Sequence, residues 1–478
     1  MRMKKFDIGK SFNNSRFKYG GYSALSAILV LAVLVAVNLV ASKLDIKKDL
    51  SKDKIYSITD QSVNIVKSLK NDVIIYAFFE TGNEDPNVKM VLDKYESSSK
   101  KVSVQYRDPI KQPQLAKKYS TSDKTVGAGS IVVESGSKFK TVDYNDLYNY
   151  SSDQYRQTDI NSFAAEQQIT NAIIYVTSGT QHTLYTLTGH QEKQLDADIK
   201  KQLDAENYQV KDINLLQGNA QLVKDNLLVV NAPLKDISKE EADKIKSFLA
   251  SGGRAAFFVD ITKEVLPNFQ SVLSAYGVKT QNALVVEGQT DMIANSAIEL
   301  LPSIQSHDIV NAIKSNKTPL YMPVMQGIEN LNINKSSLKI EPLLSSSSNS
   351  WAKTNLNSTK MSKETGDLNG PFNIAVAITD EDKTSGNTAK LIVVGGSTFM
   401  NSNINSATSG TNLDFVMNSF NWLQDKKDSV TIRPKNFEAS TLMINELQKL
   451  TWSGVVVILI PLVVAVLGIT VWFRRRHR

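Results

Sequence analysis

Polar side chains at the ends of predicted strands are the residues of this sequence best suited to bind a ligand. They are His190, Glu192, Asn231, Asp260 and Ser397. Ligands of open parallel sheets bind outside the carboxyl ends of the strands. If the four strands are neighbours, these side chains could converge on a crevice for a small polar ligand or a partner's peptide. The structural alternative is a tight turn with a hydrogen-bonded imidazole at His190 and helix caps elsewhere. We favour that alternative, because fold-level analogy alone does not establish a site.

The residues that common catalytic motifs require are missing. The chain has no cysteine, which excludes disulfides, thiolate metal sites and cysteine nucleophiles. Neither a Gly-x-x-x-x-Gly-Lys-Ser/Thr loop nor a Gly-x-Ser-x-Gly elbow occurs, and the four histidines are not spaced as metal ligands. Glu166 is interpreted as a carboxylate on a helix surface. We therefore expect no catalytic residue, no metal and no cofactor, and any ATP must be hydrolysed by another chain.

A larger domain is predicted over residues 159–430, because strands and helices alternate there repeatedly. Ser238 and Glu241 form a capping box, and the helix that follows ends at Gly252 and Gly253. The predicted strands are 183–188, 226–230, 255–259 and 391–394. This order predicts a doubly wound α/β domain. The stretch 344–370, rich in Ser, Asn, Thr and Lys, is interpreted as a mobile surface insertion.

A smaller domain is predicted over residues 44–150. A strand at 73–79, a helix at 88–97 and a strand at 102–106 form a βαβ unit with a parallel pair. A unit of this size suggests a thioredoxin-like domain. Without a Cys-x-x-Cys motif it cannot perform dithiol chemistry, so only the scaffold could have been kept. A polar stretch at 149–158 marks the boundary to the larger domain.

The net charge of +7 is concentrated at the two ends of the chain. Residues 1–21 and 474–478 together carry +9, which leaves −2 for residues 22–473, so no nucleic-acid partner is expected. Uncharged apolar runs at 22–41 and 452–473 are each long enough to span a bilayer as a helix. A cleaved signal peptide is the alternative for the first run, but its length favours an uncleaved anchor.

Basic residues beside the two runs predict their orientation. Four arginines follow the second run and six basic residues precede the first, so the positive-inside rule places both tails in the cytoplasm. Residues 44–451 would then lie outside the cytoplasmic membrane as one block tethered by two spans.

Several stretches, in their order and spacing, resemble the auxiliary membrane subunit of the GldG type, which accompanies uncharacterised ABC transporters. They are Asp49-Leu-Ser, Tyr56-Ser-Ile, 95–106 with Asp108-Pro109, Glu166 with 169–173, 187–192, Asn231-Ala-Pro233, Gly252-Gly253, 350–352, 394–397 and 418–423. The resemblance implies a non-ATPase component that works with permease and ATPase subunits. It also implies that the outer domain has a glutamine-amidotransferase-like fold without the catalytic machinery. Some family members are fused to a multi-span permease, whereas this chain has only two predicted spans.

The expected protein is therefore α/β, with a thioredoxin-like and an amidotransferase-like domain flanked by one transmembrane helix at each end. The leading function is a non-catalytic auxiliary subunit of an ABC transporter complex, whose extracytoplasmic block engages substrate or envelope partners. A tethered solute-binding module that uses the strand-end crevice is the second function. A membrane-bound hydrolase of envelope material is the third. A large outer block beside two anchors, without any energy-coupling motif, favours the first.

Overall fold

The computed structural model divides the chain into two compact units, Met1–Ser57 and Ile58–Arg478. It describes residues 15–43, 57–121, 124–151, 159–178, 182–217, 221–316, 319–426, 432–436 and 453–476. Much of the predicted tail at 1–21, and most of the predicted boundary at 149–158, lie outside the described residues.

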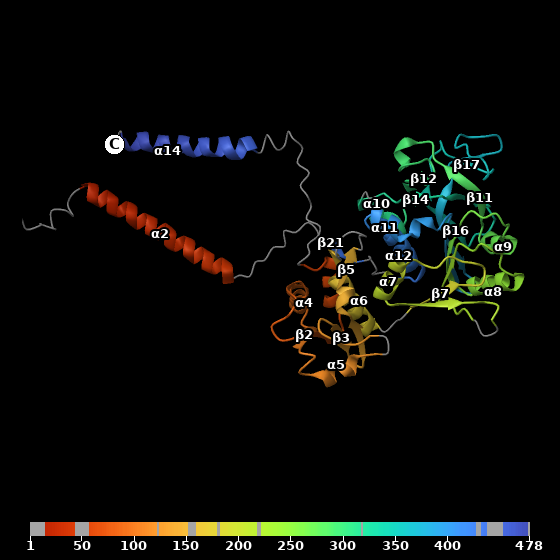
Figure 1. Ribbon diagram of the computed structural model, residues 1–478, viewed down its shortest axis with the longest axis horizontal. Helices are drawn as coiled ribbons and strands as arrows, with labels where there is room; N and C mark the ends of the chain where they lie inside the picture. The colour runs from red at the N-terminus through yellow and green to blue at the C-terminus, as the bar shows by residue number, and fades with distance from the viewer. Residues whose placement is uncertain are drawn as a thin grey trace, which may run out of the picture. The chain divides into compact units, whose positions relative to one another are not determined.

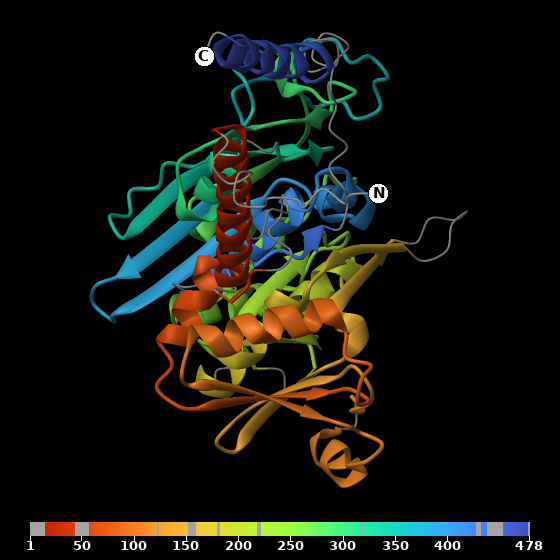
Figure 2. The same ribbon diagram turned by 90° about the vertical axis from the view of Figure 1, so that its left-hand side faces the viewer.

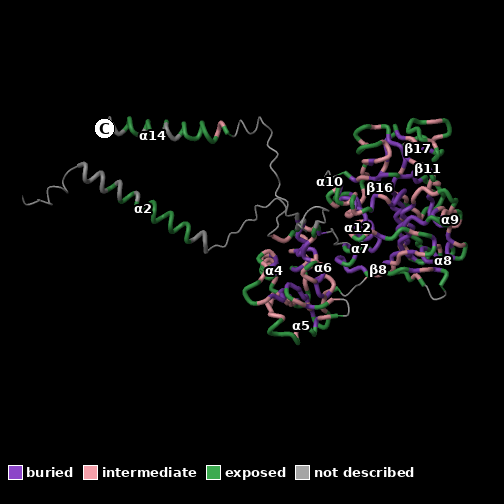
Figure 3. The backbone as a smooth tube through the Cα atoms, viewed as in Figure 1, coloured by how far each residue is buried: buried purple, intermediate pink, exposed green. Residues whose placement is uncertain are grey.

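Two long helices cover most of the described residues of the predicted membrane spans (Figure 1). Helix α2 (Ser15–Lys43) belongs to the first unit, and helix α14 (Ile460–Arg476) continues the helical turn η4 (Val455–Leu459). Among the described residues, Val455–Arg474 is the one stretch long and apolar enough to cross a membrane, with a mean hydropathy of 2.9. In α2 the corresponding apolar stretch, Ile28–Leu39, is too short by the same measure. Figure 3 shows both helices exposed along much of their described length. One of the two predicted spans is thus supported.

A four-stranded sheet of order β2-β1-β3-β4 forms the smaller predicted domain, drawn in orange in Figure 1. Strands β1 and β2 are parallel and helix α4 joins them, so the predicted βαβ unit is confirmed. Asp85 caps α4 and Pro86 occupies its first turn, which accounts for where the helix begins. The elements are α3 (Asp60–Lys67), β1 (Val73–Phe78), α4 (Pro86–Ser98), β2 (Val102–Arg107), α5 (Pro113–Tyr119), β3 (Ile131–Ser135) and β4 (Lys138–Val142). Helix α6 (Ala165–Ser178), beyond the predicted bounds of this domain, packs against β3 and β4.

A three-stranded antiparallel sheet joins two distant parts of the folded block, as we call residues 58–436. It pairs residues 435–436 with the segment at 148–163. Strand β6 (Asp159–Phe163) pairs with β5 (Tyr148–Ser151), which follows η1 (Tyr144–Leu147), and with β21 (Lys435–Asn436). Because β6 leads into α6, this pairing places Lys435 close to the start of that helix.

The larger sheet has a parallel half and an antiparallel half. The parallel half has the order β20-β10-β9-β7-β8, and its strands are β7 (His182–Leu187), β8 (Tyr208–Ile213), β9 (Leu227–Asn231), β10 (Arg254–Phe258) and β20 (Asn387–Val394). The long β19–β20 hairpin, drawn in blue in Figure 2, joins it to the antiparallel half. The strands there are β11 (Val278–Val286), β13 (Ser303–Ile304), β15 (Gln326–Asn330), β16 (Leu338–Ser345), β17 (Trp351–Lys353), β18 (Leu368–Asn369) and β19 (Asn373–Asp382).

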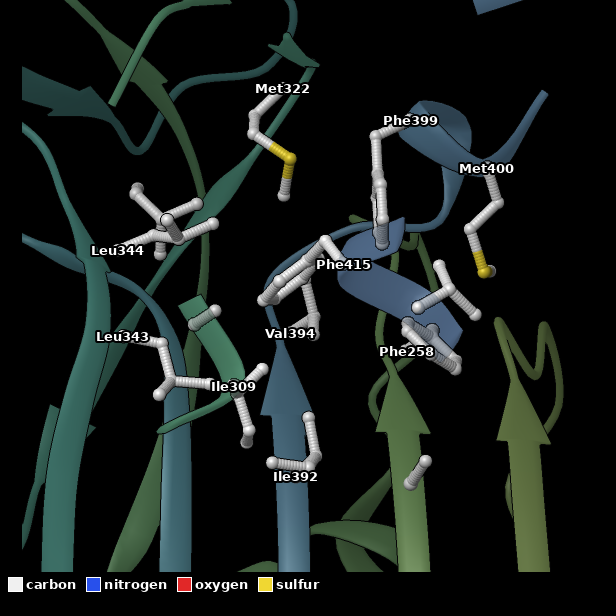
Figure 4. Packing of buried hydrophobic residues seen from close by; sticks show 14 of the residues in the cluster. Phe258, Ile309, Met322, Leu343, Leu344, Ile392, Val394, Phe399, Met400 and Phe415 are labelled. Atoms are coloured by element: carbon white, nitrogen blue, oxygen red, sulfur yellow. The ribbon is translucent and has the colours of Figure 1, made fainter. Parts of the chain in front are cut away.

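Helices cover both faces of the parallel half, because its strands are apolar on both sides. Leu227 and Val229 of β9 pack with α7 (Ala197–Ala205), α10 (Asp308–Asn316) and α12 (Thr411–Leu423), in the cluster that Figure 4 shows in part. Leu228 and Val230 pack on the other face, with α8 (Lys239–Ala250) and α9 (Pro267–Ala275). The predicted capping box of α8 is present. Short elements complete the domain: η2 (Thr290–Met292), β12 (Glu299–Leu300), β14 (Met322–Pro323), η3 (Thr398–Met400) and α11 (Ser402–Ala407).

The interpretation of 344–370 as a surface insertion is wrong for residues 344–353, whereas most of 354–370 is exposed. This stretch supplies β17 and β18 to the large sheet, and Ser346, Ser347 and Ser350 are buried. The ammonium of Lys353, 3% exposed, donates to the Ser362 carbonyl and pairs with two carboxylates of the same stretch. Serine and asparagine here build hydrogen bonds inside the fold, which composition alone does not distinguish from a solvated loop.

Candidate functional site

The five polar residues predicted at strand ends lie at one edge of the sheet, because the four strands that carry them are parallel neighbours. The spatial order β20-β10-β9-β7 places the segments after these strands side by side. The four strands are therefore neighbours, which is the condition for the predicted crevice. The five side chains nevertheless divide into two separate groups of contacts.

The first group centres on Lys193, a residue that the sequence analysis missed. Its Nζ lies 2.6 Å from an Asp260 Oδ atom and 3.2 Å from Ser397 Oγ. Asp260 also accepts hydrogen bonds from Ser397, at 2.6 Å from the backbone N–H and 2.9 Å from the hydroxyl. The Lys193 side chain is 49% exposed and that of Asp260 is 16% exposed, so solvent reaches this ion pair.

The turn that presents Ser397 depends on a glycine. A Cβ atom at Gly395 would lie 2.0 Å from the Gln326 carbonyl oxygen, so only glycine fits where β20 ends. The backbone N–H of Gln326 donates to the Gly395 carbonyl at 2.7 Å, which holds the two segments together.

Asn231 joins this first group through the backbone. Its amide nitrogen donates to the Lys193 carbonyl at 2.9 Å, and its own carbonyl accepts the Lys193 N–H at the same distance. Asn231 Oδ1 is buried and has no hydrogen-bond partner among the described residues. Asn231 therefore positions the loop that carries Lys193 and leaves one buried acceptor unused.

The second group is built around His190, whose side chain is 7% exposed. Its Nδ1 lies 2.9 Å from Glu192 Oε1, and its Nε2 lies 3.1 Å from Oε2 of Glu241, the capping-box residue of α8. Both ring nitrogens can donate only when the imidazole is protonated. The hydrogen bond with Glu192, opposed by burial and aided by the charge of Glu241, raises the pKa of His190 above its usual value.

The Ser397 hydroxyl lies between the Asp260 carboxylate and the Lys193 ammonium. Lys193 Nζ donates to both Asp260 and Ser397, so it offers the serine hydroxyl no base. His190 is enclosed by two carboxylates, and among the described residues no hydrogen bond joins it to Ser397. Four surface cavities of 430 to 750 Å³ are present in the described part of the chain, and none of these four is lined by the five predicted residues. The described residues contain no group of three His, Cys, Asp or Glu side chains that could hold a metal ion.

Glu166 is buried, which corrects its interpretation as a carboxylate on a helix surface. It is 2% exposed, and its Oε1 accepts three hydrogen bonds of 2.6 to 2.7 Å from Thr59 N, Thr59 Oγ1 and Ser62 Oγ. Its Oε2 lies 2.6 Å from Nζ of Lys435, which is also buried. Burial, and after it the charge of Glu166, raise the pKa of the neighbouring Tyr95 hydroxyl. This Glu166 cluster joins the first helix of the folded block to β21.

The parallel sheet with helices on both faces defines the larger domain as a doubly wound α/β fold. Comparison with models of known protein families identifies the family of this chain. Residues 175–419, slightly more than half of the chain, match the family described as an ABC-type uncharacterized transport system, and the chain belongs to this family of auxiliary transport proteins. Residues 52–177 match a domain of unknown function, DUF7088. No curated protein matches the chain.

Solved structures share only distant likeness with the chain. The N-terminal domain of mmIFT52 has 15% identity and a TM-score of 0.36, over 50% of this chain and 96% of that one. PurLQS from Thermotoga maritima has 11% identity and a TM-score of 0.26, over 51% of this chain and all of that one. The exo-beta-1,4-mannosidase Op5Man5 from Opitutaceae bacterium strain TAV5 has 8% identity and a TM-score of 0.28, over 70% and 48%. Likeness at this level carries no argument about function.

Proposed function

We propose that this chain is a non-catalytic auxiliary subunit of an ABC transporter, of the GldG type, which docks against permease and ATPase subunits. The observation that carries the proposal is the match of residues 175–419 to an ABC transport family. An exposed apolar helix at Val455–Arg474 supports membrane attachment. Transport energy would come from ATP hydrolysis in a separate chain.

We further propose that both predicted spans, 22–41 and 452–473, cross the cytoplasmic membrane. Helix α2 covers the first span with 29 residues, about 44 Å at the usual rise. The flanking basic residues support cytoplasmic termini, with residues 44–451 on the outer side. That block would comprise a thioredoxin-like domain at 44–150 and an amidotransferase-like domain at 159–430.

Co-purification is the direct test of the proposed complex. The tagged full-length chain, extracted in mild detergent, should bring down a multi-span permease and an ATPase with stoichiometric yield. Recovery of the chain alone, under conditions that keep a control ABC complex intact, would contradict the proposal. Protease added to intact protoplasts should digest the block at 44–451, whereas a protected block would show that the orientation is inverted.

A tethered solute-binding module is the second candidate function. The half-exposed ammonium of Lys193 and the unused Asn231 acceptor lie together at the sheet edge, where an α/β protein would bind a ligand. Calorimetry of the full-length chain with Lys193→Ala as the comparison tests it, and saturable heat that the substitution abolishes would support the module. The third candidate, an envelope hydrolase, predicts an activity that is lost on substitution of His190 and Glu192 while the fold is kept.

A further inference from the structure

The antiparallel half of the large sheet contains a cavity of about 430 Å³ whose lining is uncharged. None of its eleven lining residues is Asp, Glu, Lys, Arg or His. The residues come from three separate stretches: 289–305, which includes η2 and β13, 345–348 at the end of β16, and 371–373 at the start of β19. Its volume lies within the usual range of small-molecule sites, about 300 to 1,000 Å³. We call it the serine pocket.

Six of the lining residues, called here the polar wall, carry polar side chains without hydrogen-bond partners among the described residues. They are Gln289, Ser303, Gln305, Ser345, Ser348 and Asn373. Each carries both donor and acceptor capacity, through a hydroxyl or a primary amide. All six are partly or fully exposed, so water satisfies them when the pocket is empty of other molecules.

Next to these side chains is an inner layer of buried polar groups that bond to one another, and two of its members, Ser346 and Ser347, also line the pocket. Glu287, 1% exposed, accepts hydrogen bonds at 2.9 Å from the Gln289 and Ser347 backbone N–H groups. Ser346 Oγ accepts the Phe372 N–H at 2.8 Å and contacts Ser350 Oγ at the same distance. The inner layer therefore fixes the backbone on both sides of the pocket. A backbone held in place on both sides would lower the ordering cost of binding a ligand there.

The charge and polarity of the walls select among ligand classes. A charged ligand would lose hydration against walls that supply no opposite charge, which is costly. A wholly apolar ligand would leave the wall's amides and hydroxyls unpaired. A neutral ligand with several hydroxyl or amide groups would pair with them, and Met292 and Pro371 offer apolar surface for its carbon skeleton.

We propose that the serine pocket binds a neutral sugar, with its hydroxyl groups on Gln289, Gln305 and Ser345 and its ring carbons against Met292 and Pro371. This inference goes beyond the transporter role, since it stands on the lining of one cavity whether or not the chain joins a permease. It also places ligand binding in the antiparallel half, away from the strand-end residues.

Calorimetry on the full-length chain, in a detergent without a sugar headgroup, tests the proposal. The neutral probes are maltose, cellobiose and N,N′-diacetylchitobiose, and the charged probes are glucosamine and glucuronate. At least one neutral probe should give saturable heat, and the charged probes should bind at least tenfold more weakly. Gln305→Ala and Gln289→Ala should each weaken binding about three- to tenfold, the loss expected for one hydrogen bond. Gln114→Ala, on the exposed face of α5, should leave the affinity unchanged.

Three results would overturn the inference. They are the lack of saturable heat with all three neutral probes at 50 mM, equal affinity for charged and neutral sugars, and an equal loss of affinity in Gln114→Ala and the pocket variants. Far-ultraviolet circular dichroism of each variant identifies a folding defect. If Gln305→Ala fails to fold, Gln289→Ala decides the outcome, because Gln289 is less enclosed by sheet structure.

Discussion

Removing the charge of Glu166 tests the role of the buried Glu166 cluster. The substitution Glu166→Gln keeps the size of the side chain and one acceptor oxygen for Thr59 and Ser62. It removes the partner of Lys435, whose ammonium lies 2.6 Å from the carboxylate. The remaining lysine would be a largely buried charge that has lost the carboxylate 2.6 Å from its ammonium, because its side chain is only 8% exposed.

The expected loss of stability in Glu166→Gln follows from the burial of both partners of the ion pair. Loss of one member of a buried ion pair typically costs about 3 to 5 kcal/mol. Since 1.4 kcal/mol corresponds to a factor of ten in an equilibrium constant, local opening of β21 and β6 should become roughly a hundred to several thousand times more populated. The exposed pair of Glu240 with Lys244 provides a matched control, with side chains 70% and 38% exposed. Glu240→Gln should change stability by at most about 0.5 kcal/mol.

Hydrogen exchange read by mass spectrometry measures this opening on the full-length chain in detergent. Peptides that contain β6 and the start of α6 should exchange faster in Glu166→Gln by the factor given above, whereas peptides of β9 and β10 should be unchanged. The double variant Glu166→Gln with Lys435→Met should exchange more slowly than either single variant, because it leaves no buried charge.

Two outcomes would refute the reasoning. Exchange in Glu166→Gln less than tenfold faster than in the unchanged chain would mean that the ion pair is not a closed, buried contact. Strict additivity of the two single substitutions would mean that Glu166 and Lys435 do not interact.

Three further predictions concern His190, Lys353 and Gly395. The raised pKa of His190 means that its imidazolium stabilises the fold fully below the unfolded-state pKa and that this contribution is lost as pH rises through the folded-state pKa. His190→Asn should therefore lower the unfolding midpoint more at pH 5.5 than at pH 9, and equal losses would contradict this. Lys353→Met should expose 354–367 to proteinase K while the rest of the block resists, since the ammonium holds that stretch together. Gly395→Ala should cost about 1 to 3 kcal/mol in thermal or urea unfolding, because its methyl group meets a backbone carbonyl, whereas Gly127→Ala meets open space.

The parallel half of the large sheet could be predicted because its strands are short apolar runs that alternate with amphipathic helices. That pattern also placed five polar residues at strand ends, and these ends share one edge because the strands are parallel neighbours. Lys193 was missed because it lies in a loop, where no periodicity distinguishes a lysine that bonds Asp260 from one in solvent. Glu241 was recognised as a capping residue, but its second contact, with His190, joins segments 51 residues apart and has no local signal.

The antiparallel half and the environment of Glu166 were predicted less well. Strands β17 and β18 have three and two residues, too few for an alternating pattern, and their serine-rich surroundings resemble a loop. For Glu166 the sequence did contain a sign of burial. Ile169, Ile173 and Val176 follow at helical spacing and are buried, so Glu166 lies on the apolar face of α6. A carboxylate on such a face needs a buried partner, and Lys435, 269 positions later, could not be identified from the sequence.

The convergence of Thr59 and Lys435 on one carboxylate has a mechanical consequence. The first helix and the last strand of the folded block are fastened at the same point, so a pull arriving along the chain from either direction enters the structure at Glu166. The load would be shared between the two ends instead of passing through the large sheet.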